Sequence, residues 1–276
     1  MFTQSVKALI QTALDEDIGS GDITTDNLID PKLTGRSVLV AKEPMVLAGI
    51  DIARQVFKYL DTRMEFQALL SDGGTAETGE ALAHVQGNLA ALLKGERTAL
   101  NFLQRLSGIA TNVAAHVRLI EGSPVQLVDT RKTTPGWRVL EKYAVRMGGA
   151  RNHRMGLYDG VLIKDNHIAA FGGVAASISH IRKHVSHLVK IEVEVSTLAQ
   201  VEEALKVGVD IIMLDNMSLA DIKEAVTMIQ HAALVEVSGN VTQARLPALA
   251  DTGVDIISIG ALTHGARSVD ISMQIT

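Results

Sequence analysis

Hydrophobic and polar positions in the second half of the chain repeat one unit every 20 to 35 residues. A short aliphatic, β-branched run is followed by a polar residue, a loop and a stretch with helical spacing. Helical periodicity is clearest at 198–207 and at 218–231, where Ser218 is a suitable N-cap. Alternation of this kind predicts parallel strands with right-handed helical crossovers, closing into an incomplete (β/α) barrel. The predicted strands are 125–129, 160–165, 190–195, 210–215, 234–239 and 255–260.

Functional side chains of a (β/α) barrel lie at the C-terminal ends of its strands. In the run 190–195, a period of two puts the aliphatic residues on one face and Glu192 and Glu194 on the other, which faces the barrel interior. Carboxylates there should meet cations or a metal ion, because an unpaired buried charge is costly. The residues at the six strand ends are Asp129 with Arg131 and Lys132, Lys164, Glu194, Asp215, Ser238 and Gly260.

The first 110 residues have a different pattern. Segments 37–41 and 79–88 alternate as strands of a mixed or antiparallel sheet, with a turn between them at 71–75. The chain begins with an amphipathic helix, and a second helix at 95–121 links the two domains. We therefore predict an N-terminal α/β open sandwich domain and a barrel domain. Their bounds are 1–110 and 111–266, with the tail 267–276 a candidate to pack on the first domain, Gly108 a helix break or close-packing point, and 15–25 a tight turn.

Composition excludes several classes of protein. The chain has 276 residues, 47% of them apolar and 21% charged, enough to bury a large core. No apolar run approaches the roughly 18 residues that span a bilayer, so we expect no membrane partner. The N-terminal segment is too interrupted by polar residues for a signal peptide, which predicts a cytoplasmic protein. The absence of cysteine excludes disulfides, thiolate metal sites and a cysteine nucleophile.

Positive charge is concentrated between residues 129 and 167. This stretch has eight Lys and Arg residues against four acids, a balance of +4 in a chain whose net charge is −5. The remaining residues therefore sum to −9, a field that opposes a long polyanion such as a nucleic acid. A small carboxylate or phosphate ligand is favoured instead.

Three basic motifs in this stretch fall on the predicted active face: DTRKTTPGWR at 129–138, GGARNHRMG at 148–156 and IKDNH at 163–167. Arginine offers a planar fork for carboxylates, and lysine a point charge for phosphate. The alternatives are a solvated basic loop and, for His153, an ordinary packed or surface imidazole.

Glu194 and Asp215 offer oxygen ligands suited to Mg²⁺ or to sugar hydroxyls, although they could instead pair with basic residues of the barrel. The glycine-bearing turns 238–242 and 260–266 follow the last two strands, where barrels commonly bind phosphate. Neither a P-loop nor a dinucleotide-binding glycine motif is present. His180, His184 and His187 fit one helical face, which we interpret as a polar outer face and not as a metal site.

The order of several motifs resembles the quinolinate phosphoribosyltransferase family. The motifs are LDEDIGSGDITT, GERTALNFLQRLSGIAT, DTRKTTPG, GGARNHRMGLYD, LIKDNHI, EVEV, MLDN, EVSGN and IGALTH, which together extend from about residue 14 to residue 271. Ala150, in place of a common third glycine, and Trp137, in place of a smaller aliphatic residue, depart from the family pattern. The family's fold, an N-terminal α/β sandwich on an incomplete barrel, agrees with the organisation predicted above.

The resemblance implies Mg²⁺-dependent transfer of the phosphoribosyl group from phosphoribosyl pyrophosphate to quinolinate in de novo NAD biosynthesis. The products would be nicotinate mononucleotide, pyrophosphate and CO₂. Lys132, Lys164, Glu194 and Asp215 would be catalytic, with Glu194 and Asp215 holding Mg²⁺ and the ribose hydroxyls. The substrate-binding set implied by similarity is Arg97, Thr130, Arg131, Lys132, His153, Arg154, Lys164, Glu194, Asp215, Ser238, Gly239, Asn240, Ile259, Gly260, Ala261 and His264.

Within that set, Arg131, His153, Arg154 and Lys164 would hold the two carboxylates of quinolinate. Arg97 would reach in from the other subunit of a dimer with a shared active site. Two alternatives are a paralogous pyrophosphorylase-like protein with another acceptor, such as the type associated with molybdenum transport, and a non-catalytic barrel that binds anionic metabolites. The complete basic set argues against the first, and a sensor has less use for Glu194 and Asp215.

Overall fold

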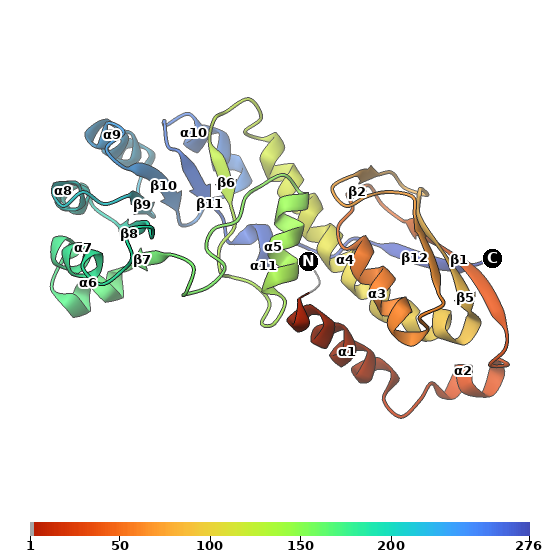
Figure 1. Ribbon diagram of the computed structural model, residues 1–276. Coiled ribbons are helices and arrows are strands. Elements are labelled where there is room, and N and C mark those ends of the chain that lie inside the picture. The colour runs from red at the N-terminus through yellow and green to blue at the C-terminus, as the bar shows by residue number, and fades with distance from the viewer. Residues whose placement is uncertain (1–2) are drawn as a thin grey trace. The chain divides into compact units, whose positions relative to one another are not determined.

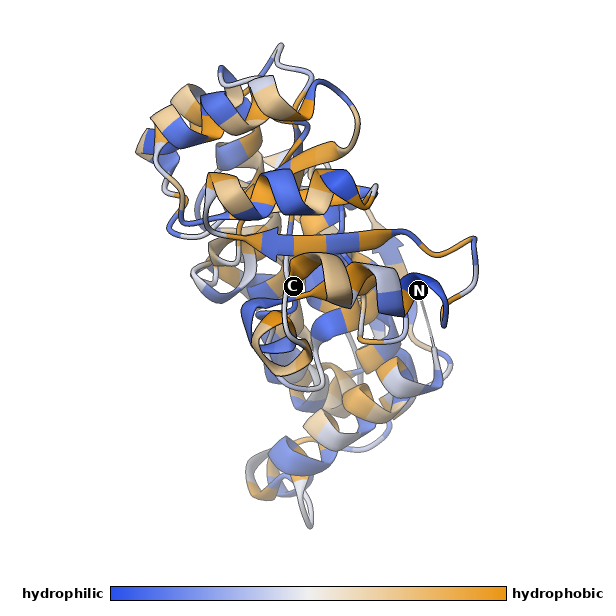
Figure 2. Ribbon diagram, turned by 90° about the vertical axis from the view of Figure 1, so that its left-hand side faces the viewer, coloured by the Kyte–Doolittle hydropathy of each residue, from blue (hydrophilic) through white to orange (hydrophobic). Residues whose placement is uncertain are grey.

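The computed structural model describes residues 3–276, which form two compact units (Figure 1). The described part of the first unit comprises 3–114, 133–149 and 262–276, and the second unit comprises 115–132 and 150–261. Hydrophobic and hydrophilic residues alternate along helices of both units, as Figure 2 shows, which is typical of helices that turn one face to a core and one to solvent. No described helix combines the length and hydropathy that crossing a membrane requires.

The first unit contains a four-stranded antiparallel sheet in the order β12-β1-β5-β3, together with a short β2-β4 pair. Its strands are β1 (Thr34–Ala41), β2 (Met45–Val46), β3 (Glu65–Ala68), β4 (Thr75–Ala76), β5 (Ala81–Asn88) and β12 (Ile271–Ile275). Its helices are α1 (Gln4–Ile18), α2 (Ile23–Leu28), α3 (Ile50–Leu60), α4 (Leu89–Arg118), α5 (Arg138–Met147) and α11 (Ala261–His264), with the last residues of α4 and the first of α11 counted in the second unit.

The elements of the first unit form where the sequence pattern predicts them. In β1, alternation buries Leu39 and Ala41 on one face of the sheet. In α1, Val6, Ile10 and Leu14 are buried at helical spacing, which confirms the amphipathic helix. The segment predicted as a tight turn is divided, since α1 runs to Ile18 and Asp22 then caps α2.

The long helix α4 is continuous through Gly108, so this glycine is a close-packing point and not a break. A Cβ atom at Gly108 would lie 2.0 Å from the carbonyl oxygen of Arg267. Only glycine lets the chain before β12 run this close to the helix. The helix starts at Leu89, six residues before the predicted start at residue 95, because the preceding strand passes directly into it.

The second unit is a six-stranded parallel sheet in the order β6-β11-β10-β9-β8-β7. Its strands are β6 (Gln126–Val128), β7 (Val161–Ile163), β8 (Ile191–Val195), β9 (Ile211–Asp215), β10 (Leu234–Ser238) and β11 (Ile256–Ser258). Its helices are α6 (Asp165–Phe171), α7 (Val174–Arg182), α8 (Leu198–Lys206), α9 (Leu219–Ile229), the 3₁₀ helix η1 (Gln243–Arg245) and α10 (Leu246–Ala250). All six predicted strands are present.

Strand order identifies this sheet as an incomplete barrel. Strands consecutive in the chain are neighbours from β7 to β11, and the last strand, β11, then pairs with the first, β6. That pairing of last with first is typical of a closing barrel. The break lies between β6 and β7, the two ends of the sheet, and within residues 3–276 the free edge of β6 has one isolated bridge, from Val128 to Arg151. The fold class predicted from the sequence is confirmed.

One detail of the sequence interpretation is wrong. Helix α7 ends at Arg182, so His184 and His187 do not continue a helical face with His180. The backbone N–H groups of Lys183 and His184 bond carbonyl oxygens three residues back, which tightens the last turn where the helix ends. The rings of His180 and His184 stack with centroids 4.3 Å apart, and all three histidines are exposed.

Candidate active site

The most deeply buried charged cluster of the second unit lies inside the barrel sheet. The His153 Nε2 atom is 3.1 Å from Glu192 Oε2 and 3.5 Å from Glu236 Oε2. The two carboxylates come from β8 and β10, which flank β9, and both side chains are more than 90% buried. The second oxygen of each carboxylate is also buried and has no hydrogen-bond partner within residues 3–276.

The backbone around His153 is fixed by Asp129, which is fully buried after β6. Its Oδ1 accepts a hydrogen bond of 2.9 Å from the His153 N–H, and its Oδ2 accepts one of 2.7 Å from Asn152 Nδ2. Both oxygens of a buried carboxylate are therefore used to hold one loop. This pairing sets where the imidazole enters the barrel.

The surroundings of His153 favour its protonated form. Burial alone would lower the pKa of the imidazole, but its hydrogen bonds to Glu192 and Glu236, with their charges, outweigh burial and raise the pKa to about 10. Burial also raises the pKa of Glu192, and the neighbouring Glu236 charge adds to that effect. One imidazolium facing two carboxylates leaves an excess of negative charge, which the raised pKa of Glu192 reflects.

Two arginines stand beside this cluster. Burial and the nearby charge of Arg131 lower the pKa of Arg154, while Glu192 acts in the opposite direction. The Arg154 guanidinium donates a hydrogen bond of 2.9 Å to the carbonyl oxygen of Gly160. Guanidinium groups close enough to oppose each other's charge form a ready site for an anion.

Lys164 and Glu194 meet at the ends of the neighbouring strands β7 and β8. The Lys164 ammonium lies 2.9 Å from Glu194 Oε2, and the lysine side chain is 41% exposed. Glu192 and Glu194 thus both meet cations, as the strand pattern predicts. For Glu194, this is also the alternative in which the acid pairs with a basic residue of the barrel.

Asp215, at the end of β9, belongs to a chain of amide contacts at the strand ends. The side-chain amide of Asn216 donates a hydrogen bond of 2.8 Å to Asp215 Oδ2. The side-chain oxygen of Asn216 accepts a hydrogen bond of 2.9 Å from Asn240 Nδ2. Gly239 has φ +86°, and a Cβ atom there would lie 2.3 Å from the Asn216 side-chain oxygen. Glycine at this position lets the turn after β10 close over Asn216.

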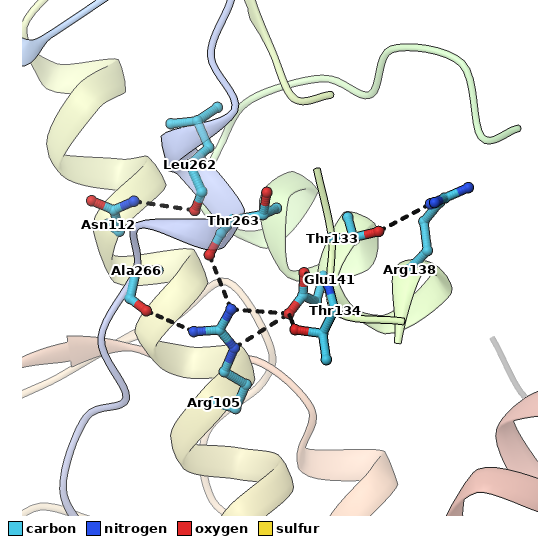
Figure 3. Close-up of polar contacts among 9 residues, drawn as sticks. All are labelled: Arg105, Asn112, Thr133, Thr134, Arg138, Glu141, Leu262, Thr263 and Ala266. Carbon is cyan, nitrogen blue, oxygen red and sulfur yellow. Dashed lines mark hydrogen bonds and ion pairs between the residues drawn. The ribbon is translucent and has the colours of Figure 1, made fainter. Parts of the chain in front are cut away.

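In the first unit, Arg105 of α4 connects two segments that adjoin predicted site residues (Figure 3). It donates to Glu141, which is fully buried, and to the carbonyl oxygens of Thr263 and Ala266. Glu141 in turn accepts from the backbone and hydroxyl of Thr134. These contacts fix the segment that follows Lys132 and the turn that contains His264.

Comparison with known proteins supplies the family. The family model described as quinolinate phosphoribosyl transferase, C-terminal domain, matches residues 109–274, and the corresponding N-terminal domain matches residues 22–107. The two matches cover nearly the whole chain in the expected order. The chain belongs to the quinolinate phosphoribosyltransferase family.

Relatives in this family cover most of the chain. A probable nicotinate-nucleotide pyrophosphorylase (carboxylating) of Synechocystis is 47% identical, covering 96% of this chain and 91% of its own. A Bacillus subtilis protein of the same description is 43% identical, covering 98% of this chain and 93% of its own. A crystal structure of NadC from Streptococcus pyogenes matches with a TM-score of 0.97 at 42% identity, covering 100% of this chain and 98% of that one.

The quinolinate phosphoribosyltransferase fold distributes the predicted site residues between the two units. Arg97 is exposed on α4, and His264 is exposed at the end of α11, both in the first unit. The others lie in the second unit at or after strand ends: Thr130, Arg131 and Lys132 after β6; His153 and Arg154 in the next loop; Lys164 after β7; Glu194 and Asp215 in β8 and β9; Ser238, Gly239 and Asn240 at the end of β10; and Ile259, Gly260 and Ala261 after β11.

Sequence reasoning missed Glu236, Asn152 and the Arg105–Glu141 pair. Glu236 gave a usable signal, because in LVEVS it lies between two valines, as Glu192 does between Ile191 and Val193. Asn152 and Glu141 gave none, since their roles depend on partners 23 and 7 or more residues away. The departure Trp137 is accommodated by stacking on Phe102, with ring centroids 4.7 Å apart.

Proposed function

We propose that the chain transfers the phosphoribosyl group of phosphoribosyl pyrophosphate to the ring nitrogen of quinolinate, with loss of CO₂, to give nicotinate mononucleotide and pyrophosphate. Family membership supports this reaction. The observation that carries the residue assignments is the cationic group at the strand ends of the barrel: Arg131, His153, Arg154 and Lys164.

Quinolinate carries two adjacent carboxylates, which suit this group of cations. Arg131 and Arg154 supply guanidinium forks, and their mutual repulsion is relieved when an anion binds between them. His153 and Lys164 supply point charges from the neighbouring loop and strand end. The cations hold the pyridine ring, so that its nitrogen is presented to C1 of the ribose.

Lys132 and the turns after β10 and β11 act on the phosphoribosyl donor. The bond from C1 to the pyrophosphate oxygen breaks with its electron pair leaving on pyrophosphate, and the ring nitrogen forms the new bond to C1. Lys132 stabilises the departing charge, while Glu194 and Asp215 hold the ribose hydroxyls and favour the positive charge that develops on the ribose. The glycine-bearing turns, including Ser238, Gly239, Asn240 and the stretch 259–261, receive the phosphate end with His264.

Decarboxylation follows because the ring nitrogen is then quaternary. The bond from C2 to its carboxylate breaks, CO₂ leaves, and the electron pair stays on C2 next to the positive nitrogen. A proton from water then adds to C2, and the retained electron pair forms the new C–H bond. The protein's task in this step is to hold the ring and exclude water from one carboxylate.

The residues present fit a magnesium ion at Glu194 and Asp215. Both supply carboxylate oxygens at the ends of adjacent strands, and Mg²⁺ is commonly held by one or two carboxylates together with substrate phosphates and water. When bound, Mg²⁺ would neutralise part of the pyrophosphate charge. The histidine-containing cluster His153, Glu192 and Glu236 suits Mg²⁺ less, since that ion prefers oxygen ligands.

The main test is release of labelled CO₂. Purified protein is incubated with quinolinate labelled in the C2 carboxyl group, phosphoribosyl pyrophosphate and Mg²⁺, and labelled CO₂ and nicotinate mononucleotide are measured. Omission of phosphoribosyl pyrophosphate is the control. Folded protein that releases no CO₂ would contradict the proposed reaction.

We also propose a homodimer whose active sites are shared. Arg97 is exposed on α4, and we infer that it completes the quinolinate site of the partner subunit. Inactive Arg97→Ala and Lys164→Ala proteins, mixed in equal amounts, unfolded and refolded together, should regain about a quarter of wild-type activity per site. The reason is that about half of the dimers are mixed, and one of the two sites in each mixed dimer is intact. Verified mixed dimers without activity would show that each site is built from one chain.

A further inference from the structure

Two glutamates outside the proposed substrate-binding set converge on one of its members. Glu192 and Glu236 approach His153 Nε2 from strands on either side of β9, at 3.1 Å and 3.5 Å. Glu236 is 1% exposed, and Val235 and Val237 are buried on the opposite face of β10, so the strand is covered on both faces at this point. Two buried acids are costly to keep, which calls for a role that apolar residues could not fill.

His153 is held from two directions. Asp129 fixes its backbone N–H at 2.9 Å, and the two glutamates contact its ring nitrogen. Titratable groups facing the imidazole or its partners include Asp129 after β6, Glu192 on β8, Glu236 on β10, and Arg154, whose charge acts on Glu192. The same contacts therefore fix the orientation of the His153 ring and favour its positive charge.

Two occupants could satisfy such a cluster, a proton on the imidazole or a metal ion. The ligand atoms of the three residues lie within 4.8 Å of one another, which a metal could bridge. However, Nε2 lies within direct contact distance of an oxygen from each acid, so a shared proton already satisfies the three atoms. A metal would need Nε2 as a ligand and would leave no proton there.

We propose that Glu192 and Glu236 are positioning residues that hold the His153 ring as a fixed imidazolium for a carboxylate of quinolinate. This proposal rests on the proposed function for the role of His153 as a substrate contact. With Arg131, Arg154 and Lys164, the imidazolium makes a fourth positive group facing a ligand of charge −2. Without the glutamates, the ring would be largely neutral at pH 8, since the ordinary pKa of histidine is about 6.5.

The first experiment needs no substrate. Wild-type protein labelled with ¹⁵N-histidine is titrated from pH 6 to 11 by NMR, and the His153 signals are assigned by their loss in His153→Gln. We expect the wild-type ring to stay protonated at pH 8 and the midpoint to fall by more than one pH unit in Glu236→Gln. The exposed Glu202→Gln, on α8, is the matched control and should leave the titration unchanged.

The second experiment separates positioning from a general structural role. In Glu236→Gln at pH 8, KM for quinolinate should rise at least tenfold, with kcat and the KM for phosphoribosyl pyrophosphate within about threefold of wild type. At pH 6 the defect should shrink, because the ring becomes protonated without help. Glu192→Gln should behave alike, and Glu202→Gln should match wild type at both pH values.

Several results would overturn the proposal. A wild-type His153 ring that titrates near pH 6.5 in folded protein would do so even if both variants failed to fold. A KM defect that is independent of pH would point to packing alone. Stoichiometric binding of Mn²⁺ or Zn²⁺ that Glu236→Gln abolishes would identify a metal site instead. If wild-type protein releases no CO₂ but its His153 ring stays protonated at pH 8 in the NMR titration, the proposed function is rejected. The conclusion that the two glutamates hold His153 as an imidazolium then stands.

Discussion

Replacing Arg105 with methionine should cost more stability than any exposed ion pair of this protein contributes. The guanidinium donates a hydrogen bond of 3.0 Å to the fully buried Glu141, one of 3.0 Å to the Thr263 carbonyl and one of 2.6 Å to the Ala266 carbonyl. Methionine keeps most of the aliphatic stem but leaves the Glu141 carboxylate, still accepting from Thr134, without a positive partner at Arg105. Breaking a buried pair by removing one partner costs about 3–5 kcal/mol.

The Arg105 side chain is 23% exposed, so water can replace part of what is lost and the lower half of that range applies. A loss of about 3 kcal/mol corresponds to a fall in Tm of about 6 °C for a chain of this size. Because Glu141 is left charged and buried, Arg105→Met/Glu141→Met should be more stable than Arg105→Met alone. The double change removes the unpaired charge and not merely one more contact.

Thermal unfolding followed by circular dichroism measures these differences, with Arg63→Met as the control. Arg63 pairs with Asp61 but its side chain is 85% exposed, so its loss should leave Tm within error. A fall of less than 2 °C in Arg105→Met, or a double variant no more stable than that single one, would refute the account of a buried, coupled pair. Folded Arg105→Met should also show a raised KM for phosphoribosyl pyrophosphate, since the pair fixes segments next to Lys132 and His264.

Three further predictions concern the barrel. Lys164→Met should lower kcat/KM for quinolinate at least a hundredfold with little change in Tm, because the exposed end of this lysine is proposed to meet substrate. Steady-state assays with CO₂ detection measure the first effect, and thermal unfolding measures the second. Since the folded-state pKa of His153 is raised to about 10, the stability it contributes is complete below about pH 6.5 and is lost as pH rises through 10. Tm of wild type should therefore fall more between pH 8 and 10.5 than Tm of His153→Gln, and parallel curves would contradict this. Gly239→Ala should raise KM for phosphoribosyl pyrophosphate and lower Tm, because the new Cβ atom would meet the Asn216 side chain and the residue has positive φ. The control is Gly208→Ala, also at positive φ but with open space around it, which should lower Tm alone. Equal kinetic effects in the two variants would show that the crowding at Asn216 is irrelevant.

The parts of the fold that depend on local periodicity could be predicted from the sequence. All six barrel strands end within two residues of the predicted positions, since a buried strand needs its aliphatic run and its polar end wherever it lies in the sheet. The same periodicity predicted that Glu192 and Glu194 face inward and meet cations, and the structure pairs them with His153 and Lys164. The domain bounds 1–110 and 111–266 stay predictions, as do the assigned substrate contacts.

Features that depend on partners far along the chain could not be predicted in this way. Arg105 and Glu141 are 36 residues apart and occupy unremarkable helix positions until the fold brings them together. His184 shows the opposite error, since the spacing of His180 and His184 fits a helix equally well whether or not the helix continues past Arg182. The end of the helix is set by the backbone hydrogen bond of Lys183 to the carbonyl three residues back. The spacing of the histidines does not predict where this change of hydrogen bonding occurs.

Two of the four proposed quinolinate-binding cations, Lys164 and His153, already contact acids of the same unit, and this affects substrate binding. Lys164 pairs with Glu194, and His153 with Glu192 and Glu236, so like charges can be held close together before a substrate enters. If Lys164 turns to a quinolinate carboxylate, Glu194 loses its partner and becomes available to the ribose hydroxyls of the second substrate. His153 differs, because both glutamates approach the same ring nitrogen, and a contact with substrate need not separate them from it. We therefore expect quinolinate to strengthen binding of phosphoribosyl pyrophosphate in wild type, and this coupling to disappear in Lys164→Met but survive in Glu236→Gln.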